Sequence, residues 1–104
     1  MLRQEIVNKL GEIIHKQAPS AKVILYGSEA RGNARKDSDI DLLILLDQEK
    51  VSLHDRQEIT YPLYDVELDT GIIINPMVLP FNLWETKYRM TPFYHNVQKE
   101  GRIV

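Results

Sequence analysis

A chain of 104 residues suits a single domain, 1–104, and its 43% hydrophobic and 27% charged residues are ordinary for a globular protein. The net charge of −2 argues against strong nucleic-acid binding, and the lack of cysteine excludes disulfides and thiolate metal sites. The apolar stretches are too short to cross a membrane, and the N-terminal residues lack the apolar core of a signal peptide. We therefore expect a cytoplasmic protein.

The first half of the chain predicts two helices and two strands. Apolar residues at helical spacing predict an amphipathic helix over residues 2–17, and a β-branched, aromatic run predicts a strand over residues 22–26. Ser28 suits the N-cap of a short helix that Gly32 ends. A second strand over residues 39–46 is apolar on both faces beyond its acids, which indicates a covered, central strand.

The second half predicts a long helix, a turn, a strand and two shorter helices, over residues 52–68, 69–71, 72–79, 80–85 and 92–99. Ser52 and Asp55 have the spacing of a capping box at the start of the long helix. Pro76 is expected to interrupt the third strand. This order of elements predicts an α/β (α+β) sandwich, a small mixed sheet flanked by helices.

Two carboxylates open the second strand. Side chains alternate along a strand, so Asp39 and Asp41 point the same way and repel each other unless a cation lies between them. Magnesium suits such a pair, because it takes few carboxylates and completes its shell with phosphates and water. Two such ions about 3.5–4 Å apart could activate an attacking hydroxyl and stabilise leaving pyrophosphate.

A Gly-Ser turn precedes these acids. Gly27 would let the backbone approach a phosphate closely, and the Ser28 hydroxyl could donate a hydrogen bond to it. Backbone amides opposite an acid–metal pair would hold a triphosphate for in-line attack. Catalysis at such a site consists mostly of positioning and charge neutralisation.

The combined pattern is Gly27-Ser28, ten residues, then Asp39-x-Asp41 at the head of an apolar strand. On this pattern, residues 23–46 resemble the nucleotidyltransferase superfamily typified by DNA polymerase beta. More narrowly, the chain is similar to the minimal nucleotidyltransferases of bacteria and archaea, which are also about this short. Residues 91–101 resemble the ending common in that group.

The resemblance implies a polymerase beta-like fold in which Gly27 and Ser28 hold the nucleotide phosphates and Asp39 and Asp41 hold magnesium. The implied reaction moves a nucleoside monophosphate, most simply AMP from ATP, to an acceptor hydroxyl. Many such proteins are encoded beside a helical HEPN protein, in several cases a toxic ribonuclease. The transferase then acts as an antitoxin, by binding the toxin or by adenylylating one of its tyrosines.

Three functions therefore remain open for this sequence. The first is an active, magnesium-dependent nucleotidyltransferase that uses ATP or another nucleoside triphosphate. The second is a catalytically weak or inactive binding module that masks a HEPN partner. The third is a catalytic module of a larger transferase, which needs another subunit to grip its substrate. Association with itself is a further expectation, because a small core leaves apolar surface to share.

Active relatives usually carry a third carboxylate on the strand after the long helix, and here residues 70–75 contain no acid. Asp69 is the acid nearest to that strand, and we take it as the candidate third catalytic and metal-binding residue. The alternative is that Asp69 belongs to a polar turn. Without a third carboxylate nothing assists deprotonation of the acceptor, so turnover should fall while nucleotide binding could survive.

Three residues near the motif each have two interpretations. Arg31 could reach a phosphate or the acceptor, or it could pair with a nearby carboxylate and brace the loop. Ser38 could contact the nucleotide or shape the start of the acidic strand. Glu29 lies beside the expected phosphate site, where its charge is unfavourable unless the side chain points away.

Overall fold

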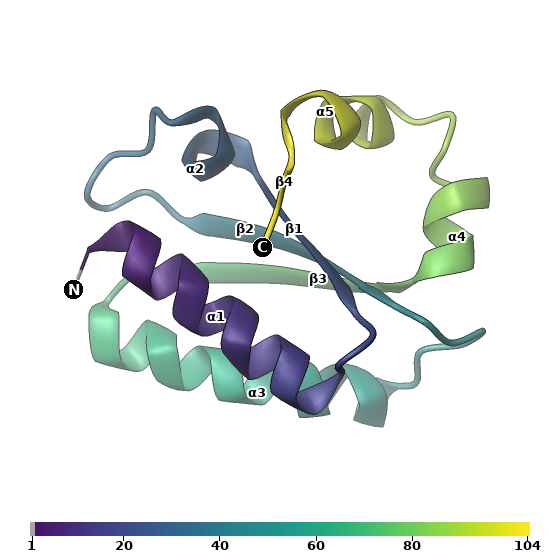
Figure 1. The fold of residues 1–104 in the computed structure, drawn as a ribbon, viewed down its shortest axis with the longest axis horizontal. Helices are drawn as coiled ribbons and strands as arrows, with labels where there is room; N and C mark the ends of the chain where they lie inside the picture. The colour runs from purple at the N-terminus through teal and green to yellow at the C-terminus, as the bar shows by residue number, and fades with distance from the viewer. Residues whose placement is uncertain (1) are drawn as a thin grey trace.

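A four-stranded sheet lies between two sets of helices in the computed structural model, which describes residues 2–104 (Figure 1). Helices α1 and α3 cover one face, and α2 and α5 lie on the other (Figure 1). Among the described residues, no helix is long and apolar enough to span a membrane. The elements in chain order are α1 (Arg3–Gln17), β1 (Lys22–Tyr26), α2 (Gly27–Arg31), β2 (Ile40–Leu46), α3 (Leu53–Thr70), β3 (Ile74–Pro80), α4 (Phe81–Thr86), α5 (Pro92–Glu100) and β4 (Arg102–Ile103).

The sheet has the strand order β3-β2-β1-β4 and is mixed, as the sequence predicts. Strand β2 runs parallel to β3 and antiparallel to β1, which in turn pairs antiparallel with β4. Helix α3 makes the crossover that a parallel pair requires. In this register Asp41 lies between Tyr26 on β1 and Asn75 on β3. The end of β1 and the beginnings of β2 and β3 therefore meet at this carboxylate.

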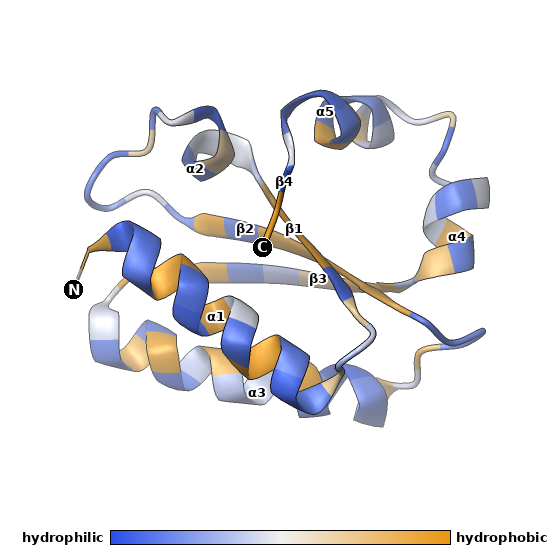
Figure 2. Ribbon diagram, viewed as in Figure 1, coloured by the Kyte–Doolittle hydropathy of each residue, from blue (hydrophilic) through white to orange (hydrophobic). Residues whose placement is uncertain are grey.

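Strand β2 separates two apolar cores. Leu42 and Ile44 pack into the core beneath α1 and α3, whereas Leu43 and Leu45 pack with Trp84 on the opposite face. All six leucine and isoleucine side chains of β2 are almost fully buried, which confirms the predicted covered strand. Figure 2 shows the same arrangement, with an apolar sheet and helices that are apolar on one side and polar on the other.

The predicted helices and strands are confirmed, with differences at several ends. Helix α2 begins at Gly27 with Tyr26 as its N-cap, so the expectation that Ser28 is the N-cap is wrong, while Gly32 ends the helix as predicted. Pro76 does not interrupt β3, because β3 is an edge strand where a missing N–H is tolerated. The two-residue strand β4 adds an element that the sequence pattern does not indicate.

The capping box at the start of α3 is present. The backbone N–H of Asp55 donates to the Ser52 hydroxyl at 3.0 Å, and the backbone N–H of Ser52 donates to the Asp55 carboxylate at 3.1 Å. The hydrogen bond from the Ser52 N–H, followed by the interaction with the Ser52 hydroxyl, holds the pKa of the Asp55 carboxyl below its ordinary value. The box fixes where the crossover helix begins.

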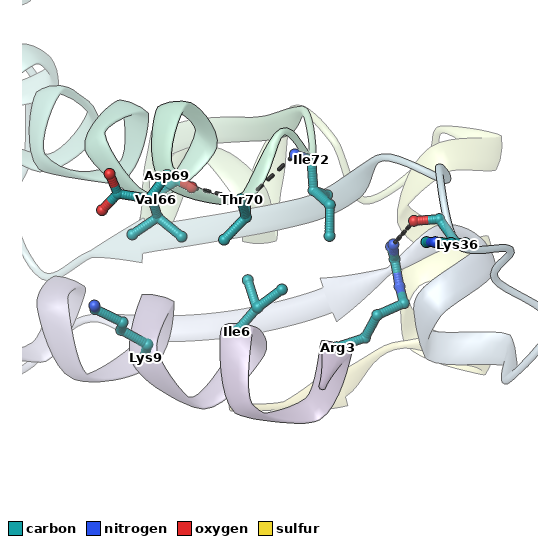
Figure 3. A pocket seen from close by; sticks show the side chains of 8 residues that line it. All are labelled: Arg3, Ile6, Lys9, Lys36, Val66, Asp69, Thr70 and Ile72. Atoms are coloured by element: carbon teal, nitrogen blue, oxygen red, sulfur yellow. Dashed lines mark hydrogen bonds between the residues drawn. The ribbon is translucent and has the colours of Figure 1, made fainter. Parts of the chain in front are cut away.

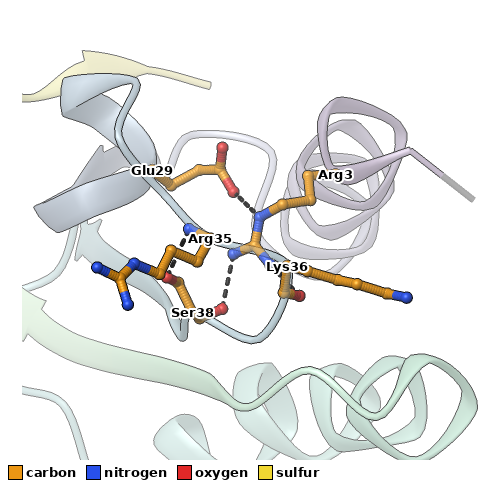
Figure 4. A network of polar contacts seen from close by, with 5 residues as sticks. All are labelled: Arg3, Glu29, Arg35, Lys36 and Ser38. Carbon is orange, nitrogen blue, oxygen red and sulfur yellow. Dashed lines mark hydrogen bonds and ion pairs between the residues drawn. The ribbon is translucent and has the colours of Figure 1, made fainter.

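Arg3 joins three parts of the chain that are distant in sequence (Figure 4). Its Nε pairs with the Glu29 carboxylate at 2.5 Å, and its two terminal nitrogens donate to the backbone carbonyls of Lys36 at 3.1 Å and Ser38 at 2.7 Å. One guanidinium thus ties α1 to α2 and to the loop 33–39 that leads into β2. It also turns Glu29 away from the region where a phosphate is expected.

We expect Arg3→Gln to lower the free energy of unfolding by about 2 kcal/mol, because hydrogen bonds to charged groups are lost from a largely covered site. Urea unfolding followed by circular dichroism measures this change. The matched control is Arg31→Gln, which removes the more exposed pair with Glu100 and should cost less than about 1 kcal/mol. Equal losses in the two variants would contradict a bracing role for Arg3.

Candidate active site

Two carboxylates and one amide meet where β2 and β3 begin. Asp39 directly precedes β2, Asp41 is its second residue, and Asn75 is the second residue of β3. The side-chain Nδ2 of Asn75 donates to Asp39 Oδ2 at 3.1 Å and to Asp41 Oδ1 at 3.0 Å. Both carboxylates therefore aim one oxygen at a common, positively polarised point, as they would at a cation.

The Gly-Ser turn lies directly against this acid pair. Gly27 follows β1 with φ of 74°, a left-handed conformation that side chains other than glycine rarely adopt. A Cβ atom built on Gly27 would collide with the Asp41 carboxylate. The lack of a side chain at Gly27 is thus what allows the start of α2, with Ser28 as its second residue, to approach the acids.

A small cavity of about 150 Å³ opens beside the turn. It lies between α2 and α5 and is lined in part by Tyr26, Gly27, Arg31 and Phe93. Tyr26 packs edge-on against Phe93 with 5.3 Å between ring centroids. Burial, and then the nearby Asp41 carboxylate, raise the pKa of the Tyr26 phenol above its ordinary value. An aromatic wall and a carboxylate pair therefore flank the turn on two sides.

Arg31 and Ser38 both make structural contacts. Arg31 pairs with Glu100 of α5 at 3.3 Å, which links α2 to the C-terminal helix at the rim of the small cavity. The Ser38 hydroxyl accepts a hydrogen bond from the backbone N–H of Arg35 at 2.8 Å, within the loop before the acids. Each contact matches the bracing interpretation of that residue.

Asp69 lies in the last turn of α3, on the side of the sheet that faces α1. Asp41 faces the other way, toward Gly27, so the structure does not bring Asp69 to the acid pair. Within residues 2–104 no three acidic or histidine side chains gather where they could hold a metal ion. The β3 side chain that faces the pair is Asn75. It lies on the strand where a third carboxylate is expected, but the prediction considers only acids and therefore misses this amide.

Comparison with known proteins shows the family to which the chain belongs. The family model for the nucleotidyltransferase domain matches residues 7–95. Because the match includes the Gly-Ser turn, the acid pair and most of the fold, the chain belongs to the nucleotidyltransferase domain family. The family and the enzyme class expected from the sequence are thereby confirmed.

Two proteins of Methanocaldococcus jannaschii, each named as a candidate protein adenylyltransferase, are similar in sequence. One is 35% identical over 83 residues, which are 80% of this chain and 76% of the relative. The other is 39% identical over 57 residues, which are 55% of this chain and 57% of the relative.

Two crystal structures share the fold, each with a TM-score of 0.61. One, described as a toxin–antitoxin with AMP-PNP, is 21% identical, and the match covers 92% of this chain and 69% of that one. The other, a candidate nucleotidyltransferase from Sulfolobus solfataricus, is 19% identical, and the match covers 95% of this chain and 76% of that one. At these identities the likeness confirms the fold class of the chain.

We expect Gly27→Ala to lower the free energy of unfolding by more than Gly32→Ala. Both glycines have positive φ, but a Cβ at Gly32 meets no atom within 4 Å, whereas one at Gly27 meets the Asp41 carboxylate. The left-handed backbone alone should cost about 1–2 kcal/mol in each variant. The excess in Gly27→Ala, measured by urea unfolding, reports the contact with Asp41. Equal costs would contradict that contact.

Proposed function

We propose that this enzyme transfers AMP from ATP to a hydroxyl group of a partner protein. Its family, confirmed above, transfers nucleotides, and two relatives are named as candidate protein adenylyltransferases. A protein with the same fold is described as a toxin–antitoxin with AMP-PNP, an ATP analogue. In the proposed pair this chain is the antitoxin, and the acceptor is a tyrosine of a helical HEPN toxin.

The contact between Gly27 and the Asp41 carboxylate carries this proposal. It brings together a glycine turn that can approach phosphates and an acid pair that can bind a cation, at one end of the sheet. A triphosphate held at the turn would have its negative charge beside the carboxylates, which requires cations between them. The geometry thus supports binding a nucleotide together with its metal.

The residues present fit magnesium. The Asp39 and Asp41 oxygens that converge on the Asn75 amide nitrogen can converge equally on one cation. Two carboxylates are a usual protein contribution for magnesium, and triphosphate oxygens and water supply the rest. We propose that the second ion of the expected pair enters with the nucleotide. When bound, magnesium would neutralise the charge that develops on the phosphates and hold them for in-line attack.

The roles of the side chains follow from their places. Asp39 and Asp41 hold magnesium, while the backbone at Gly27 and the Ser28 hydroxyl bind the phosphates. Arg31 and Ser38 act through their contacts with Glu100 and Arg35, which keep α2 and the loop in position.

One observation favours a second function, the masking of a toxin partner without chemistry. Asn75 occupies the β3 position that faces both acids, and an amide cannot accept the proton of an attacking hydroxyl as a carboxylate can. Nucleotide binding would survive this difference, whereas turnover would be slow. The two functions therefore predict the same bound nucleotide but different rates of AMP transfer.

The first experiment is calorimetric titration of the protein with ATP, CTP, GTP and UTP, each with and without magnesium. The proposal expects magnesium-dependent binding that is tightest for ATP. Mass spectrometry of the protein encoded by the adjacent gene, after incubation with ATP, magnesium and this enzyme, then tests for added AMP. Binding without transfer would favour the masking function, and absence of nucleotide binding would contradict both the site and the transfer.

A further inference from the structure

A larger cavity lies on the opposite face of the sheet, between α1, the end of α3 and the loop 33–39 (Figure 3). Its volume is about 390 Å³, within the range of small-molecule sites. It is separated from the acid pair by β2, because Leu42 of β2 packs toward α1 and α3 while Asp41 contacts Gly27 on the other side. The proposed nucleotide site therefore leaves this cavity without a role.

Charged and apolar side chains are segregated within the cavity. Figure 3 shows Arg3 and Lys36 at one end, Lys9 and Asp69 at the other, and apolar side chains along its length. The apolar residues at the cavity are Ile6, Val66 and Ile72. Ile72 is the partly exposed one, because Ile6 and Val66 are only 2% and 4% exposed. Three cations line the cavity with one acid, and Glu29 is paired with Arg3 just outside it, so a net charge of +1 remains in a protein whose overall charge is −2.

The end formed by Arg3 and Lys36 retains capacity to bind an anion. A guanidinium has five N–H donors, and Arg3 uses three of them, on Glu29 and on the carbonyls of Lys36 and Ser38. Within residues 2–104, the Lys36 ammonium forms no ion pair. A carboxylate or phosphate at this end would therefore find two N–H donors of Arg3 and a lysine close by.

From this arrangement we propose that the cavity binds a small organic acid. Its anionic group, a carboxylate or a phosphate ester, lies against Arg3 and Lys36. Its apolar body, of about the size of one ring, packs mainly on Ile72, above the buried side chains of Ile6 and Val66. Charge complementarity at one end and an apolar lining along the length together select an anion with a hydrophobic body over a free inorganic ion.

Binding at this cavity would also affect the loop before the acid pair. Arg3 lines the cavity and at the same time holds the carbonyl of Ser38, the residue before Asp39. An anion that attracts the guanidinium weakens its hold on the loop and on Glu29. This second part of the inference rests on the proposed nucleotide site, and reciprocity requires that nucleotide and acid then alter each other's affinity equally.

The direct test is a titration of the ¹⁵N-labelled protein, without nucleotide or metal, followed by NMR chemical shifts. Phenylacetate and phenyl phosphate serve as the two acids, and phenylacetamide is the uncharged control. We expect saturable shifts at the amides of Ile6, Thr70 and Ile72 with an acid and weaker binding of the amide. The stronger of the two acids identifies the preferred anionic group.

Lys36→Gln should weaken binding of the acid about tenfold, because it removes a charged partner from the anion end. Lys87→Gln removes the same charge from the end of α4, away from the cavity, and should leave the affinity unchanged. The proposal is overturned if neither acid gives saturable shifts at these amides at millimolar concentration. It is also overturned if phenylacetamide binds as tightly as phenylacetate, or if the shifts centre on Gly27 and Asp41.

The coupling has its own measurement. ATP affinity in the presence of magnesium should change at least twofold when the cavity is saturated with the acid, and in Lys36→Gln the same change should require about tenfold more acid. An unchanged ATP affinity at saturation would overturn the coupling. Failure of ATP to bind at all would contradict the proposed function, and the nucleotide-free titration would still decide whether the cavity binds the acid.

Discussion

Asp41→Asn is expected to abolish magnesium-dependent ATP binding and to lower the rate of AMP transfer by on the order of 10³-fold. Asparagine has nearly the shape of aspartate, so the packing against Gly27 can persist while the negative charge is lost. One carboxylate, Asp39, then remains to hold magnesium. Calorimetry with ATP and magnesium, and pyrophosphate release with the partner present, measure the two effects.

The matched control is Asp47→Asn, which removes the same charge from an exposed residue just beyond the other end of β2. It should leave nucleotide binding unchanged. In Asp41→Asn the pKa of Tyr26, followed by ultraviolet absorbance against pH, should fall because Asp41 helps to raise it, yet stay above the ordinary value because burial remains. If Asp41→Asn lowers the pKa of Tyr26 as expected and still binds ATP with full affinity, the role given to Asp41 is contradicted.

The sequence predicts much of the site because the motif is local. A strand, a glycine turn, a short helix and an acidic strand lie within residues 23–46, and antiparallel pairing of β1 with β2 brings Tyr26 opposite Asp41. The Gly-Ser turn and the acids must therefore meet at the same end of the sheet. Strand alternation also places Asp39 and Asp41 on one face, and the shared hydrogen bonds with Asn75 agree with that.

The third position of the site depends on a longer-range feature, the register between β3 and β2. Proximity along the chain favours Asp69, but α3 continues through Thr70, whose hydroxyl donates to the Val66 carbonyl, and ends only at Gly71. That extra length keeps Asp69 in the helix layer. The parallel pairing of β3 with β2 then places Asn75 directly beside Asp41, a relation that no local pattern encodes.

The contacts of Arg3 are likewise not predictable from local sequence patterns. Its contacts with Glu29 and with the carbonyls of Lys36 and Ser38 span 26 to 35 residues. From the sequence alone, Arg3 is one more charge on the polar side of an amphipathic helix. The fold brings it beside α2 and the loop before the acids, and this position explains how Glu29 can lie near a phosphate site without opposing it.

Asn75→Asp is expected to turn this site into one with three carboxylates. The new side chain replaces an amide that hydrogen-bonds both acids with a third negative charge at the same point. Without metal, the variant should be about 1–2 kcal/mol less stable than the wild-type protein, because two hydrogen bonds become repulsions. Magnesium should reverse this loss, since a ligand that binds only the folded state stabilises it. Thermal unfolding with and without magnesium measures the loss of stability and its reversal by the metal.

The same variant should raise the rate of AMP transfer by about 10²-fold, because a carboxylate at this position can accept the proton of the attacking hydroxyl. Asn75→Ala is the matched control: it also removes the hydrogen bonds to Asp39 and Asp41 but adds no base, so it should show no gain. A gain confined to Asn75→Asp would mean that the amide limits an otherwise complete catalytic site. Metal-dependent stabilisation without any transfer would instead mean that the acceptor side of the site is absent, which favours masking of the partner.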